Sequence, residues 1–500
     1  MEKMVDNNLI QNVVIVGGGT AGWITAALMA KVLNKTINIT LIESDEIASV
    51  GVGEASIPPI MHLNNALGID ESAFLKATKG TFKLGIEFEN WQYQGSKYMH
   101  AFGGMGKDFP FCDFYNFWLK SKQLGIHSEF GDYSLNYQCA KQHKFSKLKN
   151  IQGTNLKGIE YAYHFDAVLY ANFLREFSVK HGVKRIEGIV KKVNLNPKNG
   201  FISSVHMESG ETISADLFID CSGQRALLIE DALHTGFDDW SHWLRCDSAI
   251  TVASEAMKSI PPYTRSIAHQ AGWQWRIPLQ HRMGNGIVYS NHYMSDEHAE
   301  DALLSSLDSK IISETKKIQF RTGRRRKQWN KNVVAIGLSS GFFEPLESTN
   351  IHLIQTAAIR LLKLFPHLGI TKHNIDEFNR QALIESEHIR DFIILHYKQN
   401  QRDESDFWRD CSLMDIPDSL TRKIELFENS GQVFREQDEL FTEVAWQQVM
   451  IGQGLMPKDY HPLVNQIDAK QLTDLMQSLS TLIQRTAGKM STHNDYLSLL

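Results

Sequence analysis

The chain has little cysteine and no long apolar run. Its 500 residues contain five cysteines, which are widely scattered and form no CxxC pair. This pattern argues against a disulfide framework and predicts no zinc or other metal site. The first eleven residues are polar, and no stretch approaches 20 consecutive apolar residues, so neither a secretory signal nor a transmembrane helix is indicated. We therefore expect a soluble cytoplasmic protein that does not bind membranes.

The chain also lacks an excess of charge of one sign. Its 52 basic and 57 acidic residues give a net charge of −5, and its short basic cluster is Arg-Arg-Arg-Lys at residues 324–327. We expect this cluster to be a solvated strand end or loop, and we expect no nucleic-acid partner. Sequence repeats and low-complexity linkers are absent too. A chain of this length with 42% hydrophobic residues can bury a large core in one large or two merged domains.

The amino-terminal part begins with a strand, a glycine-rich turn, a helix and a second strand. Residues 12–16 are a β-branched run typical of a buried parallel strand, and residues 23–33 form an alanine-rich helical stretch. Residues 37–42 supply the next strand. The whole unit is roughly 30 residues long, as expected of a βαβ unit that binds a nucleotide.

The rest of the chain divides into a β-rich middle and a helical end. Strands are predicted at residues 186–193, 201–207, 217–220 and 333–336, and a helix at residues 350–364. From residue 376 onward apolar residues recur at three- and four-residue steps, which is typical of helices. We expect an α/β fold with two packed parts. They are a main domain at residues 1–375 and a helical carboxyl-terminal subdomain at residues 376–500 that covers the substrate site.

A dinucleotide site is predicted at the first turn. Residues 17–22, Gly-Gly-Gly-Thr-Ala-Gly, fit GxGxxG directly after a strand and before a helix. The glycines let the backbone approach a pyrophosphate, and the helix start offers free N–H groups to its charge. A carboxylate at the end of the second strand can accept hydrogen bonds from ribose hydroxyls. The predicted contacts are Gly17, Gly19, Thr20, Ala21, Gly22 and Glu43.

The dinucleotide is expected to be FAD rather than NAD. The chain holds one such fingerprint, and residues 215–223, Ala-Asp-Leu-Phe-Ile-Asp-Cys-Ser-Gly, resemble the second strand motif of the glutathione-reductase-type FAD fold. A second fingerprint for NAD(P)H is absent. Reduced flavin is therefore expected from a separate NAD(P)H-dependent flavin reductase, or the nicotinamide binds only in passing.

The hexapeptide Trp-Gln-Trp-Arg-Ile-Pro at residues 273–278 is the most specific motif. Two tryptophans at i and i+2 of a strand face the same way, and the proline closes the strand. Taken alone, such a strand is more often core. The string resembles the Trp-x-Trp-x-Ile-Pro signature of flavin-dependent halogenases of the tryptophan-halogenase family. Residues 50–58 resemble that family's mobile flavin strap, and residues 344–350 resemble its Glu-Pro-Leu-Glu-Ser-Thr-Gly segment.

The resemblance spans residues 12 to about 365 and implies a two-component FAD-dependent halogenase. Such an enzyme uses reduced FAD, oxygen and a halide, chloride or bromide, to make hypohalous acid. This acid then halogenates an electron-rich aromatic substrate such as an indole or phenol. Trp273, Trp275 and Pro278 would form the barrier between flavin and substrate. The resemblance also implies flavin contacts at Gly53, Val190, Leu338 and Ile351.

Two catalytic residues are implied by the same resemblance. Lys79 matches the family's essential lysine in local sequence and in distance from the amino terminus, while Lys76 and Lys83 are expected to be solvated. An ammonium at this position can polarise hypohalous acid, whereas a neutral amine can be halogenated to a haloamine. Glu347 would face the lysine and either orient the halogenating species or take the proton from the cationic ring.

Halide and substrate contacts follow from two further segments. In the family, the backbone amides that match Thr349 and Asn350 bind halide beside the flavin. Asn350 stands where well-known members have glycine, and we expect halide binding to persist because asparagine tolerates a left-handed backbone. The stretch His-Ala-Phe-Gly resembles one that lines the family's substrate site, which implies contacts at His100 and Phe102.

The carboxyl-terminal region departs from the family pattern. Tryptophan-specific members hold the amino-acid backbone with two tyrosines and an acid, whereas residues 443–453 here read Glu-Val-Ala-Trp-Gln-Gln-Val-Met-Ile-Gly-Gln. Tryptophan binding is therefore not carried over, and Trp446 is expected to be a stacking wall for another aromatic, or else core. Two alternatives stay open, a flavin-dependent aromatic hydroxylase and a non-catalytic flavin-binding protein. A homodimer is possible.

Overall fold

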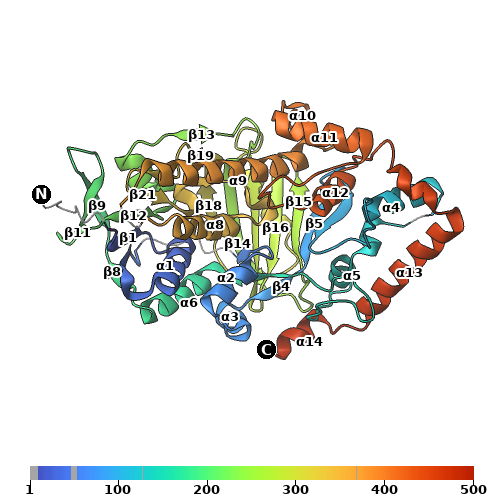
Figure 1. The fold of residues 1–500 in the computed structure, drawn as a ribbon, viewed down its shortest axis with the longest axis horizontal. Coiled ribbons are helices and arrows are strands. Elements are labelled where there is room, and N and C mark those ends of the chain that lie inside the picture. Colours follow the sequence, from blue (N-terminus) through green and yellow to red (C-terminus); the bar gives the residue numbers. More distant parts are fainter. Residues whose placement is uncertain (1–8, 47–52, 127, 367–368) are drawn as a thin grey trace, which may run out of the picture.

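The computed structural model describes residues 9–46, 53–126, 128–366 and 369–500. Figure 1 shows three regions along the long axis of the molecule. A mostly parallel sheet lies at the end that holds the amino terminus, a larger mixed sheet occupies the middle, and the carboxyl-terminal helices gather at the far end. This agrees with the predicted α/β class.

The first sheet contains the predicted βαβ unit. In the described residues it has six strands in the order β20-β21-β12-β1-β2-β8, and all neighbours are parallel except β20 and β21. Its strands are β1 (Asn12–Val16), β2 (Asn38–Glu43), β8 (Lys184–Glu187), β12 (Leu217–Asp220), β20 (Trp329–Asn330) and β21 (Val333–Ala335). Their apolar side chains are buried because helices cover the sheet, as in other parallel sheets.

Three helices pack together beside this sheet. They are α1 (Thr20–Leu33), α6 (Ala167–Lys180) and α8 (Asn350–Lys363). Helix α1 buries Trp23 and a run of small residues, so its neighbours can approach closely. As a result the amino-terminal ends of α1 and α8 open toward the same space, although they are 330 positions apart in the sequence.

The second sheet carries the tryptophan motif in its interior. Its order is β18-β14-β17-β16-β15-β5-β6, antiparallel except between β15 and β5. The strands are β5 (Gly85–Glu89), β6 (Lys97–Ala101), β14 (Ser248–Glu255), β15 (Thr264–His269), β16 (Gly272–Pro278), β17 (Arg282–Tyr289) and β18 (Lys316–Gln319). Every residue of β16 is buried, and the strand ends at the proline as predicted.

Three smaller sheets of three strands each complete the described fold. The remaining strands are β3 (Gly53–Ala55), β4 (Thr81–Lys83), β7 (Ala162–Asp166), β9 (Val190–Leu195), β10 (Ile202–Met207), β11 (Thr212–Ser214), β13 (Phe237–Asp239), β19 (Gly323–Arg325) and β22 (Gly341–Phe342). The strand predicted at residues 186–193 is two strands, β8 and β9. The chain turns between them at Gly188, whose φ of 146° suits glycine alone.

The basic cluster at residues 324–327 is not solvated throughout, contrary to expectation. It begins in β19, and Arg324 is 3% exposed and paired with Asp238. Arg325 pairs with Glu230. Asp238 and Glu230 therefore balance part of the charge of this cluster, whereas Arg326 and Lys327 are exposed.

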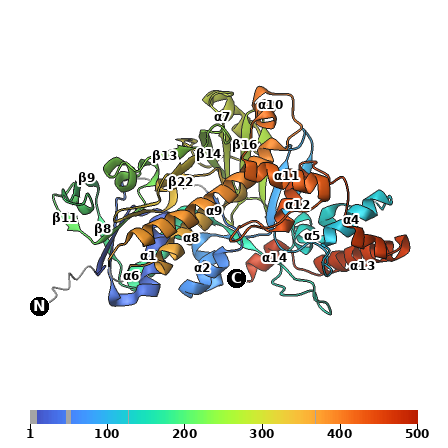
Figure 2. The ribbon, with the colours of Figure 1, turned by 45° about the horizontal axis from the view of Figure 1, so that its top comes forward.

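The helical end of the chain packs directly on the second sheet. Helix α9 (Lys372–Lys398) lies beside α8 and runs toward the other carboxyl-terminal helices (Figure 2). Helix α12 (Glu443–Gly452) packs on β6, and α13 (Ala469–Gly488) packs on α4 and α5. The boundary expected after residue 375 falls within α9. The other helices are α2 (Ile60–Leu67), α3 (Glu71–Thr78), α4 (Phe114–Gln123), α5 (Leu135–Lys141), α7 (Asp296–Ser305), α10 (Asp406–Leu413), α11 (Asp418–Ser430) and α14 (His493–Ser498).

All five cysteines are free and buried. Among the residues that the structure describes, every helix is too short or too polar to cross a membrane.

Gly22, the last glycine of the first turn, is predicted to be essential for stability. A Cβ at Gly22 would lie 1.9 Å from the carbonyl oxygen of Gly17, which is backbone and cannot move away. We expect Gly22→Ala to destabilise the flavin-free protein by about 1–3 kcal/mol, as overpacking commonly does. The thermal midpoint measured by calorimetry should fall. At Gly19, where a Cβ would meet no atom within 4 Å, the same substitution should leave the midpoint unchanged. Equal midpoints for both variants would contradict this account.

Candidate active site

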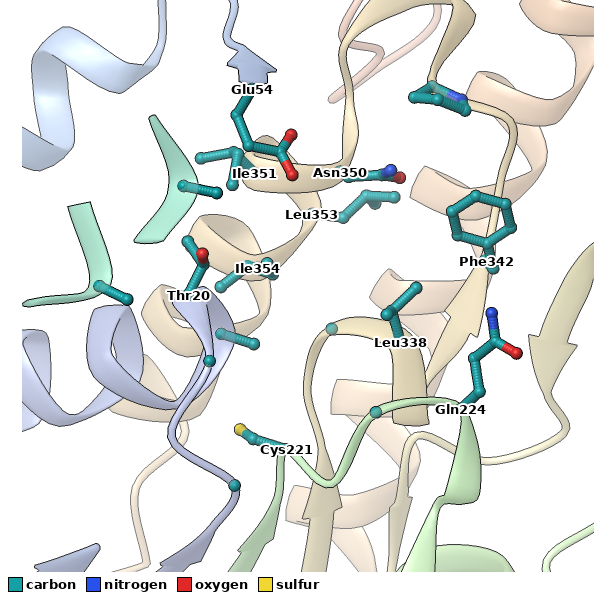
Figure 3. Close-up of a pocket in the computed structure, with 18 of the residues that line it drawn as sticks. Thr20, Glu54, Cys221, Gln224, Leu338, Phe342, Asn350, Ile351, Leu353 and Ile354 are labelled. Carbon is teal, nitrogen blue, oxygen red and sulfur yellow. The ribbon is translucent and has the colours of Figure 1, made fainter. Parts of the chain in front are cut away.

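A cavity of about 850 Å³ lies where α1, α8 and the carboxyl ends of the parallel strands meet. Figure 3 shows Thr20 at the start of α1 across from Ile354 of α8, with Cys221 and Gln224 at one end. Glu54 and Asn350 lie toward the other end. Crevices at the carboxyl ends of parallel strands are where such sheets bind nucleotides.

The glycine-rich turn has space for a ligand at one position only. A Cβ at Gly17 would lie 2.1 Å from the carbonyl oxygen of Cys221, and one at Gly18 would lie 1.6 Å from Oε2 of Glu43. At Gly19 the same atom would meet nothing. Gly19 is also the N-cap of α1, and no side chain caps that helix start. A pyrophosphate can therefore approach the backbone at Gly19 and accept hydrogen bonds from the helix amides.

Glu43 is held in place at the end of β2. The indole Nε1 of Trp23 donates to its Oε2 at 3.1 Å, and Nε of Arg185 donates to its Oε1 at 2.5 Å. The carboxylate lines the cavity and retains lone pairs for ribose hydroxyls. The residues present therefore fit the adenosine end of FAD.

All but one of the predicted cofactor contacts line the larger cavity. Gly17, Gly19, Thr20, Ala21, Glu43, Gly53, Val190, Leu338 and Ile351 all line the larger cavity. Gly22 does not line it, because this residue packs behind the carbonyl of Gly17.

The segment expected to act as a flavin strap is described in part. Residues 50–52 lie outside the described residues, whereas Gly53, Glu54 and Ala55 line the larger cavity and Ile57 and Pro58 line a second one. Burial raises the pKa of the Glu54 carboxyl to about 7. One short stretch of chain thus touches both cavities.

The two tryptophans of β16 form one wall of the larger cavity. Their ring centroids are 6.1 Å apart and both rings line the space. Trp273 donates from Nε1 to Oε2 of Glu344 at 3.0 Å, and Tyr397 donates to the same oxygen. Burial raises the pKa of Glu344 to about 7. Pro278 lines neither cavity, and its carbonyl accepts a hydrogen bond from the Thr81 hydroxyl at 2.7 Å.

A second cavity of about 490 Å³ lies between β6, the strap segment and the start of α12. His100 and Phe102 line it, as predicted for substrate contacts. Phe441, Thr442 and residues of α12 form the opposite side. Gln448 of α12 is unavailable for a ligand because it exchanges hydrogen bonds of 3.1 Å with the backbone of Ala101.

Glu347 lies against the second cavity and is surrounded by histidines. It is 1% exposed, with Oε2 2.9 Å from Nδ1 of His100 and Oε1 2.9 Å from Nε2 of His396. Burial alone would raise the pKa of this carboxyl, but the two imidazole groups lower it to about 2. Glu347 is therefore a carboxylate at neutral pH.

The structure does not bring Lys79 to Glu347, and this expectation was wrong. Lys79 is the exposed C-cap residue of α3, in a left-handed conformation with φ of 52°. The expected solvated residue, Lys83, is instead fully buried at the end of β4. Helix α3 ends at Thr78, so Lys79 lies in the turn that follows it. In β4 the alternation of side chains places Thr81 and Lys83 on the same face of the strand.

Lys83 stands between the two cavities. Its Nζ donates to Oγ of Ser348 at 2.8 Å, and Ser348 lines the larger cavity. The same Nζ lies 5.5 Å from the ring centroid of Phe102, which lines the smaller cavity. Burial lowers the pKa of Lys83 to about 7, although the negative charge of Glu347 opposes this shift. Of the two lysines, Lys83 and not Lys79 is therefore the one buried within reach of the charge of Glu347.

The expectation of a left-handed backbone at Asn350 was also wrong. Asn350 is the first residue of α8, and the left-handed position is Ser348, with φ of 59° and ψ of 36°. The chain reverses there because the short 3₁₀ turn Pro345–Glu347 must redirect into the helix. In the described part of the chain, the amides of Thr349 and Asn350 donate no hydrogen bond. They remain suited to an anion, and Asn350 lines the larger cavity.

Trp446 is part of the core and does not line the smaller cavity. Of the two alternatives for this residue, a stacking wall or core, the structure supports the second. The side chain of Trp446 is fully buried, and its Nε1 donates to Oε1 of Glu439 at 2.8 Å. The ammonium of Lys423 lies 4.9 Å from its ring centroid and 3.0 Å from Oε2 of Glu439. These contacts anchor the loop before α12, which supplies Leu440 and Phe441 to the cavity.

The chain is similar to proteins of one known family. A family model described as tryptophan halogenase matches residues 12–469. The chain belongs to the tryptophan halogenase family. Tryptophan 6-halogenase ThaL of Streptomyces albogriseolus is 34% identical over 500 residues, with 91% of this chain and 92% of that protein covered.

Two solved structures are very similar to the halogenase described here. Xcc4156, a flavin-dependent halogenase from Xanthomonas campestris, superimposes with a TM-score of 0.96 at 45% identity over 98% of each chain. BrvH, a flavin-dependent halogenase from Brevundimonas sp. BAL3, gives 0.94 at 41% identity over 98% of this chain and 99% of that one. The chain is therefore a flavin-dependent halogenase that acts on an aromatic substrate with FAD and a halide.

The sequence did not indicate that two residues, Lys83 and His396, belong to this site. Lys83 was identifiable from the alternation of residues 81–83 after Gly80, which places it on the face of Thr81 rather than in a helix. His396 carried no local signal, because it is one of several polar residues in the long helix α9.

Flavin affinity is predicted to depend on the open space at Gly19. The methyl group of Gly19→Ala would occupy the position from which a pyrophosphate reaches the backbone, so we expect FAD to bind about tenfold more weakly, or worse. Fluorescence titration with FAD measures this affinity. Gly488 has no neighbour within 4 Å of its Cβ position either, and Gly488→Ala in α13 serves as the control with unchanged affinity. Wild-type affinity in Gly19→Ala would rule out this placement of the pyrophosphate.

Proposed function

We propose that the enzyme halogenates an uncharged, electron-rich aromatic ring, indole-like or phenol-like, in the smaller cavity, with Lys83 and Glu347 as catalytic residues. The position of Lys83 carries this proposal. Its ammonium contacts a residue of the larger cavity on one side and faces the ring of a residue of the smaller cavity on the other. A diffusible oxidant made in the first space must pass this group to reach the second.

Reduced FAD, bound in the larger cavity, would supply hypohalous acid from oxygen and halide. Gly19 and the α1 amides would hold its pyrophosphate, Glu43 its ribose, and Trp273 and Trp275 would separate it from the organic substrate. Thr349 and Asn350 would hold the halide through their amides. Since the chain has a single dinucleotide fingerprint, we propose that a separate NAD(P)H-dependent reductase supplies the reduced flavin.

Lys83 would deliver the halogen as an ammonium group. Glu347 and the ring of Phe102 both favour its charged form, which can donate a hydrogen bond to the hydroxyl oxygen of hypohalous acid. A ring carbon then takes the halogen as the bond between oxygen and halogen breaks, and the oxygen keeps the electron pair and leaves as hydroxide, which is hydrogen-bonded to the ammonium. The ring becomes cationic, Glu347 stabilises this charge and accepts the proton, and the C–H electron pair returns to the ring.

The charges around the smaller cavity favour a substrate without a carboxylate. Among the described residues that line it, none is Lys or Arg, whereas Glu160 and Glu347 are acidic. A free amino acid would bring its own carboxylate next to these acids, and no Lys or Arg among the described lining residues could pair with it, which is costly at a partly buried site. Indole and simple phenols have no such group.

The function is tested with a panel of indole, phenol and tryptophan, supplied with reduced FAD, oxygen and bromide and analysed by mass spectrometry. We expect indole or phenol to be halogenated and tryptophan to react at least about tenfold more slowly. Lys83→Met should abolish ring halogenation while FAD binding persists, and Lys79→Met should keep wild-type activity. Full activity in Lys83→Met would remove that residue from the mechanism.

The pH dependence separates the two chemical roles of lysine. A group with a pKa of about 7 is charged below that pH and neutral above it. Because we assign Lys83 as the ammonium, the rate of ring halogenation under single-turnover conditions should fall as pH rises through about 7. The control variant Lys79→Met should show the same fall in rate over the same pH range. A rate that rises through this range would instead favour the haloamine route.

A further inference from the structure

We propose that His396 is a positioning residue that orients Glu347 and keeps it charged. This inference rests on the proposed catalytic role of Glu347. His396 lies on α9, more than 40 positions after Glu347 in the sequence, and its side chain is fully buried. It lines neither cavity, so within the described residues it can act on substrate only through the carboxylate.

Both ring nitrogens of His396 face oxygen acceptors. Nδ1 lies 2.8 Å from the carbonyl oxygen of Phe392, and Nε2 lies 2.9 Å from Oε1 of Glu347. A neutral imidazole has one N–H group and cannot donate to both, whereas the doubly protonated ring can. The Nε2 contact is close but poorly aligned for a hydrogen bond.

The ring of His396 is fixed by an aromatic cage. Phe88 lies 4.8 Å from it between centroids, Phe392 5.4 Å and Trp91 6.0 Å. Gln453, the residue that follows α12, donates from Nε2 to the backbone carbonyl of His396. These contacts hold Nε2 against Glu347 whether or not substrate is present, which is the preorganisation that catalysis requires.

Each of the two histidines contacts a different oxygen of the Glu347 carboxylate. His100 contacts Oε2 and lines the substrate cavity, whereas His396 contacts Oε1 from behind. The other titratable groups that face Glu347 are Lys83 from β4 and Tyr98 from β6. Without His396, Oε1 would be buried with no partner. Glu347 would then protonate at a higher pH and lose its fixed orientation.

The test compares two substitutions at this position. His396→Phe keeps a ring in the cage and removes both donors, and His396→Gln keeps one N–H donor within reach of Oε1. We expect His396→Phe to lower kcat about tenfold or more at neutral pH with little change in KM, and to move the acid limb of the pH profile upward. His396→Gln should restore much of kcat. The control is His388→Phe, two turns earlier on α9 and outside both cavities, which should match wild type.

A second readout does not require turnover. Infrared difference spectra between each protein and its Glu347→Gln partner isolate the protonation of this carboxyl as pH falls. We expect protonation at least about one pH unit higher in His396→Phe than in wild type, while calorimetry shows a folded protein. An unchanged infrared midpoint, or equal loss of kcat in the Phe and Gln variants, would overturn the proposal. If wild type halogenates no ring but the infrared shift is present, the proposed function fails and the coupling of His396 to Glu347 stands.

Discussion

The burial of opposite charges between two cavities is the constraint on which the site depends. Lys83 and Glu347 are both removed from water, and neither would remain there without the partners that surround it. Ser348 and the ring of Phe102 contact the ammonium of Lys83, and His100 and His396 contact the carboxylate of Glu347. Because these partners come from three separate segments, the end of β6, α9 and the turn before α8, the site exists only when all three are assembled.

The two-sheet architecture makes this burial possible. The parallel sheet supplies the nucleotide crevice, and the mixed sheet presents its tryptophan-bearing strand to that crevice and β6 to the second cavity. The segment that begins with β3 touches both spaces. Separate cavities suit the proposed scheme, in which an oxidant is generated in one cavity and consumed in the other and the tryptophan wall keeps the bulky reactants apart.

Local patterns were sufficient where one element carries the chemistry. The strands at residues 12–16 and 217–220, the glycine turn and the tryptophan motif all fell where predicted, since each depends on short-range backbone rules. The prediction for Lys79 was wrong because distance from the amino terminus does not show which side chains alternate to the buried face of a strand. The strand predicted at residues 186–193 divides at Gly188, where the φ value decides the break.

The sequence by itself determined the family, the nucleotide crevice at the first glycine turn and the motif that carries Glu347, because these follow from contiguous motifs. Tertiary structure alone decided which lysine is buried, that Trp446 is core, and that His396 meets Glu347. The physical reason is that burial and charge pairing arise between segments far apart in the chain. The environment of a titratable group is a property of the assembled fold, and no local pattern contains it.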